Sequence, residues 1–309
     1  MSKFIVFNIQ LLPVDRAAES EEVGPDGYLQ LFWHLNEQVK KVLAAKALML
    51  TAFRLVQDSY FAPLPATPVT AVENGADGEL FVLGAFIKFD KTSSVEDLYT
   101  RVTLFEQQEG QEGISGRREY PFIFNPRAHW LAVDTQSGRL PSIKNLEKAL
   151  NHFLKGIADE HFPHHVLTIN LVSKKDELVS VLERAVGFKK IEVDLTFKNG
   201  PTSDEVLDDF AENRLHRLHL RATTERGGVM PHVPQTIDGI VRNAAGYGRA
   251  SITFVESVDG KNVTTSFQTE NAPETVGGRQ QRNEDTTGFF RRMNSRLLEL
   301  ARKVGHLGD

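Results

Sequence analysis

The chain of 309 residues contains no cysteine. That absence excludes disulfide bonds, thiolate catalysis and cysteine-ligated zinc. No apolar run approaches the roughly 18 residues that a membrane span requires. The apolar stretch at residues 4–12 is interrupted by Asn8 and Gln10, and Pro13 follows it in place of a small-residue cleavage site. We therefore interpret this stretch as a first strand and expect a cytoplasmic protein.

Motifs that bind phosphate or activate a nucleophile are also absent. The sequence has no G-x-x-x-x-G-K-[ST] loop, and Gly246-Tyr247-Gly248 follows a predicted helix, which is the reverse of a dinucleotide fingerprint. Gly113-Ile114-Ser115-Gly116 is one residue short of G-x-S-x-G and lies in a predicted loop. We therefore assign no catalytic residue and no cofactor, and we favour a protein that is not an enzyme.

Charge and length set broader limits. The 36 basic and 41 acidic residues give a net charge of -5, which argues against a uniformly basic coat but leaves room for a local basic patch. The length suits two domains. Residues 107–118 are rich in Gln, Glu and Gly, with Ile114 as the only large apolar residue. We therefore predict an N-terminal domain at 1–118 and a C-terminal domain at 119–309.

In the N-terminal part, residues 29–46 carry Leu31, Leu35, Val39 and Leu43 at intervals of four, which predicts an amphipathic helix. Strand composition marks residues 4–12, 49–57, 80–90 and 99–105. Apolar residues fall on both faces of 80–90, which is typical of a central strand.

The C-terminal part alternates strands and helices. We predict strands at 128–133, 166–172, 191–197 and 215–222, helices that Ser142, Ser173, Thr202 and Pro234 open, a hairpin of 249–258 with 262–269 around Asp259-Gly260, and a final helix at 288–304. The β–helix–β passages favour some parallel pairing. The fold class is therefore α/β or α+β, with a mixed β-sheet and flanking helices in the C-terminal half and a smaller α+β N-terminal half.

One group of residues combines histidines with carboxylates. Asp159, Glu160, His161, His164 and His165 have side chains that suit zinc or manganese, but Pro163 breaks the helix and no metal template fits. A histidine-rich helix end stabilised by the helix dipole is the favoured interpretation, and we assign no metal.

Acidic residues offer an alternative. Glu192 and Asp194 share one strand face, an acidic helix carries Asp204, Glu205, Asp208, Asp209 and Glu212, and Glu256, Asp259 and Lys261 approximate a nuclease spacing. A hairpin turn at Asp259-Gly260 explains the last set without chemistry. The alternative hypothesis is a metal-dependent nuclease that uses Asp194, Asp259 or His164.

Basic residues give the preferred hypothesis. Strand alternation places Arg217, His219 and Arg221 on one face. Near the C-terminus, Glu284, Asp285 and Glu299 oppose a larger set of basic residues, so that the segment has a net charge of +4. That set is Arg279, Arg282, Arg291, Arg292, Arg296, Arg302 and Lys303. Such a surface suits a phosphate backbone, and a solvated helix face is the competing interpretation.

The final helix also has an apolar stripe, formed by Phe290, Met293, Leu297, Leu300 and Val304. A stripe of this length docks a helix on the body of its own chain, on a protein partner or on a second copy. A scaffold of this kind is a further alternative.

A family resemblance rests on the order of elements and on several short runs. These are Ala128-His129-Trp130-Leu131-Ala132-Val133, Lys174-Lys175-Asp176, Ile191-Glu192-Val193-Asp194 and Asn199-Gly200-Pro201-Thr202-Ser203-Asp204. They resemble an uncharacterised bacterial family, a domain of unknown function associated with phage defence. The layout of the C-terminal half is more remotely similar to the phage-exclusion protein RexA. The resemblance covers residues 122–269 and implies a cytosolic defence or exclusion protein that binds nucleic acid.

Overall fold

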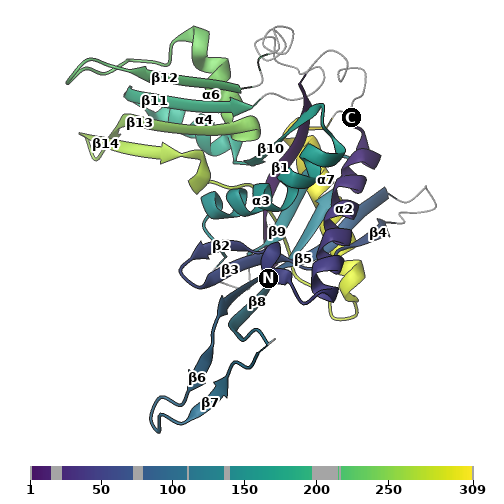
Figure 1. The fold of residues 1–309 in the computed structure, drawn as a ribbon. Helices are drawn as coiled ribbons and strands as arrows, with labels where there is room; N and C mark the ends of the chain where they lie inside the picture. The colour runs from purple at the N-terminus through teal and green to yellow at the C-terminus, as the bar shows by residue number, and fades with distance from the viewer. Residues whose placement is uncertain are drawn as a thin grey trace.

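The computed structural model describes residues 2–14, 23–71, 79–109, 111–135, 140–196, 215 and 217–307. The predicted turns at 136–138 and 199–201, the acidic helix after Thr202 and the end of the strand predicted at 191–197 lie outside these ranges. Within them the chain forms a large sheet, a smaller sheet and a projecting two-stranded arm (Figure 1). The α+β class is confirmed.

Nine strands form the large sheet. Its order is β10 (His165–Leu171), β1 (Ser2–Pro13), β9 (Trp130–Asp134), β8 (Ile114–Asn125), β5 (Glu79–Lys91), β3 (Ser59–Pro63) and β2 (Phe53–Val56), while β15 (Thr275–Gly278) pairs with β1 and β4 (Thr67–Ala71) pairs with β5. Strand β8 continues across residue 118, so both sides of the predicted domain boundary contribute to one sheet. The strand β15 lies in a segment for which the sequence predicts no regular structure.

Strand pairing departs from the expectation of parallel neighbours, because every pair in the described ranges is antiparallel. The helix α3 (Ile143–His161) does connect two strands of the same direction, β9 and β10, but β1 lies between them and runs opposite to both. The order β10-β1-β9-β8 is that of a ferredoxin-like split β-α-β arrangement. Local sequence reasoning does not detect an N-terminal strand inserted between two later ones.

Helices cover both faces of the large sheet. On one face, α2 (Pro25–Ala44) and α3 bury a core that includes Phe7, Leu31 and Leu150. On the other, α7 (Thr286–Lys303) packs Phe290, Met293 and Leu297 against Phe4 and Val6 of β1 and neighbouring strands. The predicted apolar stripe of the terminal helix therefore docks on the body of the chain.

The smaller sheet is covered on one face. Its order is β12 (Arg217–Thr223), β11 (Gly187–Thr196), β13 (Gly248–Val258) and β14 (Lys261–Gln268). The helices α4 (Lys175–Arg184) and α6 (Gln235–Tyr247) share a core with the alternate residues Ile191, Val193 and Leu195 of β11. The intervening residues of β11 face the other way, as the alternation of 191–197 predicts.

Two helix starts test the predicted caps. The hydroxyl of Ser142 accepts a hydrogen bond from the Asn145 amide at 3.4 Å, so this cap is confirmed. The predicted cap at Ser173 is wrong, because α4 begins after Lys174 and the Ser173 hydroxyl donates to the Thr269 carbonyl at 2.9 Å. Ser173 thereby joins the large sheet to the short helix η2 (Thr269–Asn271) beside the small sheet.

The arm consists of β6 (Ser94–Glu96) and β7 (Thr103–Glu106), which pair only with each other in the described ranges. Figure 1 shows it projecting from the end of β5 and β8, away from both helical layers. A short helix, η1 (Leu48–Leu50), completes the elements. Among the described helices, none combines the length and apolarity that crossing a membrane requires.

Candidate nucleic-acid interface and charged seam

The C-terminal arginines surround α7, whose position follows from its cap and its stripe. The Asp285 carboxylate accepts a hydrogen bond from the Gly288 amide at 2.7 Å, which fixes the start of the helix. Phe289, Phe290, Met293 and Leu297 are buried on the large sheet. The opposite side of α7 therefore faces solvent.

Two of these arginines have structural partners. Arg292 donates to both oxygens of Glu284, at 2.9 and 2.6 Å, and its guanidinium lies 5.5 Å from the centre of the Phe289 ring. These hydrogen bonds lower the pKa of Glu284. Arg296 donates to the Gly277 carbonyl of β15. Both side chains hold the β15–α7 connection in place.

Other members of the C-terminal set face solvent. Arg279 and Arg282 lie in the exposed connection before α7, and Arg291 and Arg302 lie on its outer side. In the described part of the chain, no ion pair involves the side chains of Arg279, Arg282 or Arg302. These three guanidinium groups are available to an external anion.

Arg217 and Arg221 lie on the open face of the small sheet, each beside an acid of the neighbouring strand. Arg217 donates from Nε to Asp194 at 2.8 Å, and Arg221 lies 3.4 Å from Glu192. The hydrogen bond from Arg217 lowers the pKa of Asp194. The pKa of Glu192 is lowered chiefly by its hydrogen bond from Lys190. The predicted alternation is therefore present, but it gives a face of mixed charge.

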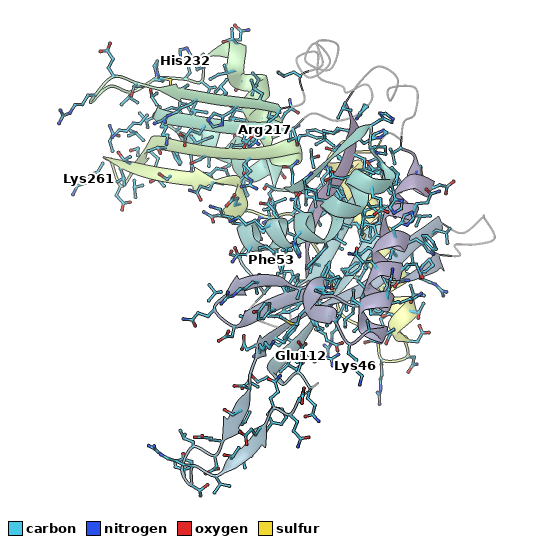
Figure 2. The ribbon with its side chains drawn as sticks, viewed as in Figure 1. Lys46, Phe53, Glu112, Arg217, His232 and Lys261 are labelled. Carbon is cyan, nitrogen blue, oxygen red and sulfur yellow. The ribbon has the colours of Figure 1, made fainter. Side chains whose placement is uncertain are left out.

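These eight arginines do not form one patch. Arg217 is labelled in Figure 2 on the small sheet, whereas α7 packs on the large sheet. The structure thus separates the predicted interface into a C-terminal group and a small-sheet pair.

A second cluster, which we call the seam, lies where the two sheets meet. Arg249 at the start of β13 forms ion pairs with Glu147 of α3 and with Glu270, the latter at 3.1 Å. Two hollows of about 300 and 220 Å³ adjoin it, and both are lined by Asp194 and Arg249. Asn170 of β10 donates to Thr196 of β11 at 2.5 Å and ties the sheets together.

Glu147 is the buried charge of the seam, with 3% of its surface exposed. Burial raises its pKa, and Arg249 together with the Leu171 amide, which donates to Glu147 at 3.3 Å, opposes that shift. Sequence reasoning missed the seam. The available signal was Glu147 itself, which falls on the apolar stripe of its helix four residues after Ile143 and three before Leu150.

The predicted histidine group is divided by the fold. His161 ends α3 and stacks on His34 of α2, with ring centres 3.5 Å apart and planes 9° from parallel. Burial lowers the pKa of His34. Within the described ranges, no three His, Asp or Glu side chains gather as metal ligands would.

The acidic residues proposed for a nuclease site also lie apart in the structure. Asp259 has a φ of 51° in the tight turn between β13 and β14. Asp194 is the register neighbour of Arg249, which lies at the opposite end of β13. At about 3.3 Å per residue, that end is roughly 30 Å from Asp259. The Glu256 carboxylate accepts hydrogen bonds from the side chains of Arg184 and Thr265. The fold does not bring these acids together.

A comparison with protein families matches residues 3–297 to a model described as a domain of unknown function, DUF4747. The chain belongs to the DUF4747 family. No curated protein matches it. The expectation of an uncharacterised domain family is confirmed, and the expected association of this DUF4747 protein with phage defence and with RexA stays a prediction.

Proposed function

We propose that this DUF4747 protein binds nucleic acid, with duplex DNA as the preferred form, through the C-terminal basic surface formed by Arg279, Arg282, Arg291 and Arg302. The observation that carries the proposal is the burial of the α7 stripe, which turns the arginine side of the helix outward. Arg279, Arg282 and Arg302 have no carboxylate partner in the described ranges, so phosphate contact breaks no ion pair of theirs.

The length of the surface suits a duplex. The 18 residues of α7 span roughly 27 Å at 1.5 Å per residue. Along the duplex axis each strand has one phosphate every 3.4 Å or so, so the surface extends over the axial length of about eight phosphates of one strand. Contacts to phosphate release condensed counterions, and binding should weaken steeply as salt rises.

Arg217 and Arg221 are a second contact area in this proposal. To contact a phosphate, each of the two arginines must give up its ion pair with a carboxylate of β11. The loss of that ion pair reduces the free energy gained from the phosphate contact. The outward residues of β11 and β12 include no Phe, Tyr or Trp in the described ranges. Stacking of single-stranded bases therefore has little support on this face.

The test is binding of labelled duplex DNA across a salt series. Reversal of Arg279, Arg282 and Arg302 to Glu should abolish detectable binding at moderate salt, while the unmodified chain shows a negative slope of log affinity against log salt. The matched control reverses Lys46, Arg226 and Lys261, which are also exposed and which change the net charge equally. Figure 2 labels Lys46, in the turn after α2, far from Lys261 on the small sheet. Equal losses in both triple variants would contradict the proposed surface, and so would no binding at low salt.

A cytosolic phage-defence or exclusion role is the second part of the proposal, and its support is the family resemblance alone. Cells that carry the chain should plate phage less efficiently than cells that carry the Arg279, Arg282 and Arg302 reversal. Full DNA binding without any effect on plating would reject the defence role and leave the binding proposal intact.

A further inference from the structure

The arm carries an unusual concentration of exposed apolar side chains. The exposed fractions are 82% for Leu98, 90% for Tyr99, 59% for Val102 and 66% for Leu104. An isolated two-stranded ribbon is at best marginally stable in water, and large exposed apolar groups that gather together mark interaction sites. We therefore expect the arm to bind a partner through these side chains.

The tip of the arm is rigidly constructed. The Asp97 carboxylate accepts hydrogen bonds from the amides of Tyr99 and Thr100, at 3.0 and 2.6 Å, and from the Thr100 hydroxyl at 2.7 Å. The Asp97 amide in turn donates to the Val102 carbonyl at 2.9 Å, and Arg101 takes a positive φ of 58°. Leu98 and Tyr99 are thus presented outward by a preorganised loop, which reduces the entropy lost on docking.

A groove between α2 and α3 has complementary features. It measures about 850 Å³, has Phe153 and Ile157 as its apolar floor, and carries both basic and acidic side chains at its edge, among them Lys40, Lys41 and Glu160. Trp33, 57% exposed, lies next to it through its ring contact with His34. Exposed tryptophan beside an apolar floor is typical of the centre of a protein interface.

Gly156 indicates that the groove is kept open. A glycine in the interior of α3 weakens the helix relative to alanine. No atom lies within 4 Å of the place where its Cβ would be, so packing inside the chain does not require glycine there. The space above it can receive a side chain from outside.

Charge supports the arm as the occupant of the groove. Residues 92–113 contain five acidic residues and one arginine. In the groove, Glu37 pairs with Lys40 at 3.0 Å and Glu160 lies 4.0 Å from His161, while Lys41 has no ion pair in the described ranges. An acidic arm with an apolar tip therefore matches the apolar floor of the groove and the Lys41 ammonium at its edge.

We propose that the arm of one copy docks Leu98 and Tyr99 into the α2–α3 groove of a second copy, with the reciprocal contact closing a two-fold dimer. The arm projects away from its own α2 and α3, so the contact is made between copies (Figure 1). A two-fold exchange uses each arm and each groove once and leaves neither surface open to a third copy.

The experiment is sedimentation equilibrium of the full chain over a concentration series. A double change, Leu98→Glu with Tyr99→Glu, should weaken dimerisation at least about tenfold, since aromatic anchors dominate such contacts. Gly156→Leu should do the same by filling the groove. The matched controls are Val263→Glu, an exposed valine on β14, and Gly246→Leu, another helical glycine with open space at its Cβ position. Both controls should dimerise like the unmodified chain.

Mixing the two variants separates arm exchange from other contacts. The arm variant keeps its groove and the Gly156→Leu chain keeps its arm, so the mixture should form heterodimers more strongly than either variant forms homodimers. A charge exchange, Lys41→Glu combined with Glu96→Lys, should recover part of what each single change loses. A monomer at every concentration would overturn the proposal. So would a dimer that Leu98, Tyr99 and Gly156 do not affect, because the arm would then serve another partner.

Discussion

The two sheets differ in how much of their surface the chain itself covers. The large sheet has helices on both faces, α2 and α3 on one and α7 on the other. The small sheet has α4 and α6 on one face and a polar surface with Lys190, Glu192 and Asp194 on the other. Apolar residues therefore occur on both faces of β1 and β5, whereas β11 alternates.

The difference indicates where an external molecule can act. A sheet with two buried faces has no surface left for a ligand except at its edges and projections. Accordingly, the candidate surfaces of the large sheet are the arm, the outer sides of its helices and the edge strand β10, which meets the small sheet at the seam. The small sheet instead offers a whole face.

The largest difference in stability between variants of the two sheets should follow removal of an aromatic ring from the core of the large sheet. Phe122 is 1% exposed and contacts the rings of Phe86 and Phe32, with centres 4.7 and 6.1 Å away. Phe122→Ala should lower the free energy of unfolding by about 4 kcal/mol, through lost burial and a cavity. Thr253→Ala on the open face of β13 should cost under about 0.5 kcal/mol. Denaturant unfolding measures both, and similar losses would refute the contrast.

A smaller effect should follow Arg249→Ala at the seam. The change leaves the buried Glu147 carboxylate without its ion pair, and we expect a loss of about 2–3 kcal/mol, below the value for a fully buried pair because Arg249 is half-exposed. Adding Glu147→Gln should restore part of the loss, since a neutral amide needs no counter-charge. No recovery in the double variant would show that Arg249 acts through Glu270 instead.

The seam also has a pH signature. Burial raises the pKa of Glu147, so the folded state binds this proton more tightly than the unfolded state does. The stabilising contribution of protonation is complete below the unfolded pKa of about 4.3 and is lost as pH rises through the folded pKa. Relative to Glu147→Gln, the unmodified chain should therefore gain stability as the solution is acidified from neutral pH. A gain on alkalinisation would contradict the assignment.

Sequence reasoning succeeded where a pattern is local. The stripe of α2, the Ser142 cap and the alternation of β11 each involve neighbours within one element, and all three are present. It failed where partners are distant in the chain. The insertion of β1 between β9 and β10 and the pairing of Arg249 with Glu147 join residues more than a hundred positions apart, and no local period records such contacts.

The same limit applies to the candidate interface. The sequence identified Arg217 and Arg221 as basic, but register with β11 decides that each lies beside an acid. It treated the C-terminal arginines as one set, although Arg292 and Arg296 are held by Glu284 and Gly277. Part of the arm was predicted as a strand at 99–105 beside the domain boundary, since exposed apolar residues on a ribbon have the same composition as buried ones.

The smallest expected change in stability concerns buried polar side chains in the large sheet. Asn8 is fully buried on the α7 face of β1, and neither polar atom of its amide has a hydrogen-bond partner within the described ranges. Its register neighbour Trp130 and the nearby Gln10 also bury polar atoms without partners. Replacing an unsatisfied buried amide by an apolar group of similar shape is neutral or stabilising. Asn8→Leu should therefore raise the free energy of unfolding by about 1 kcal/mol, and Val6→Asn, which introduces an amide two residues away on the same face, should lower it. If Asn8→Leu instead destabilises the chain, this row of polar groups binds something inside the covered sheet, and the large sheet has an internal site as well as external ones.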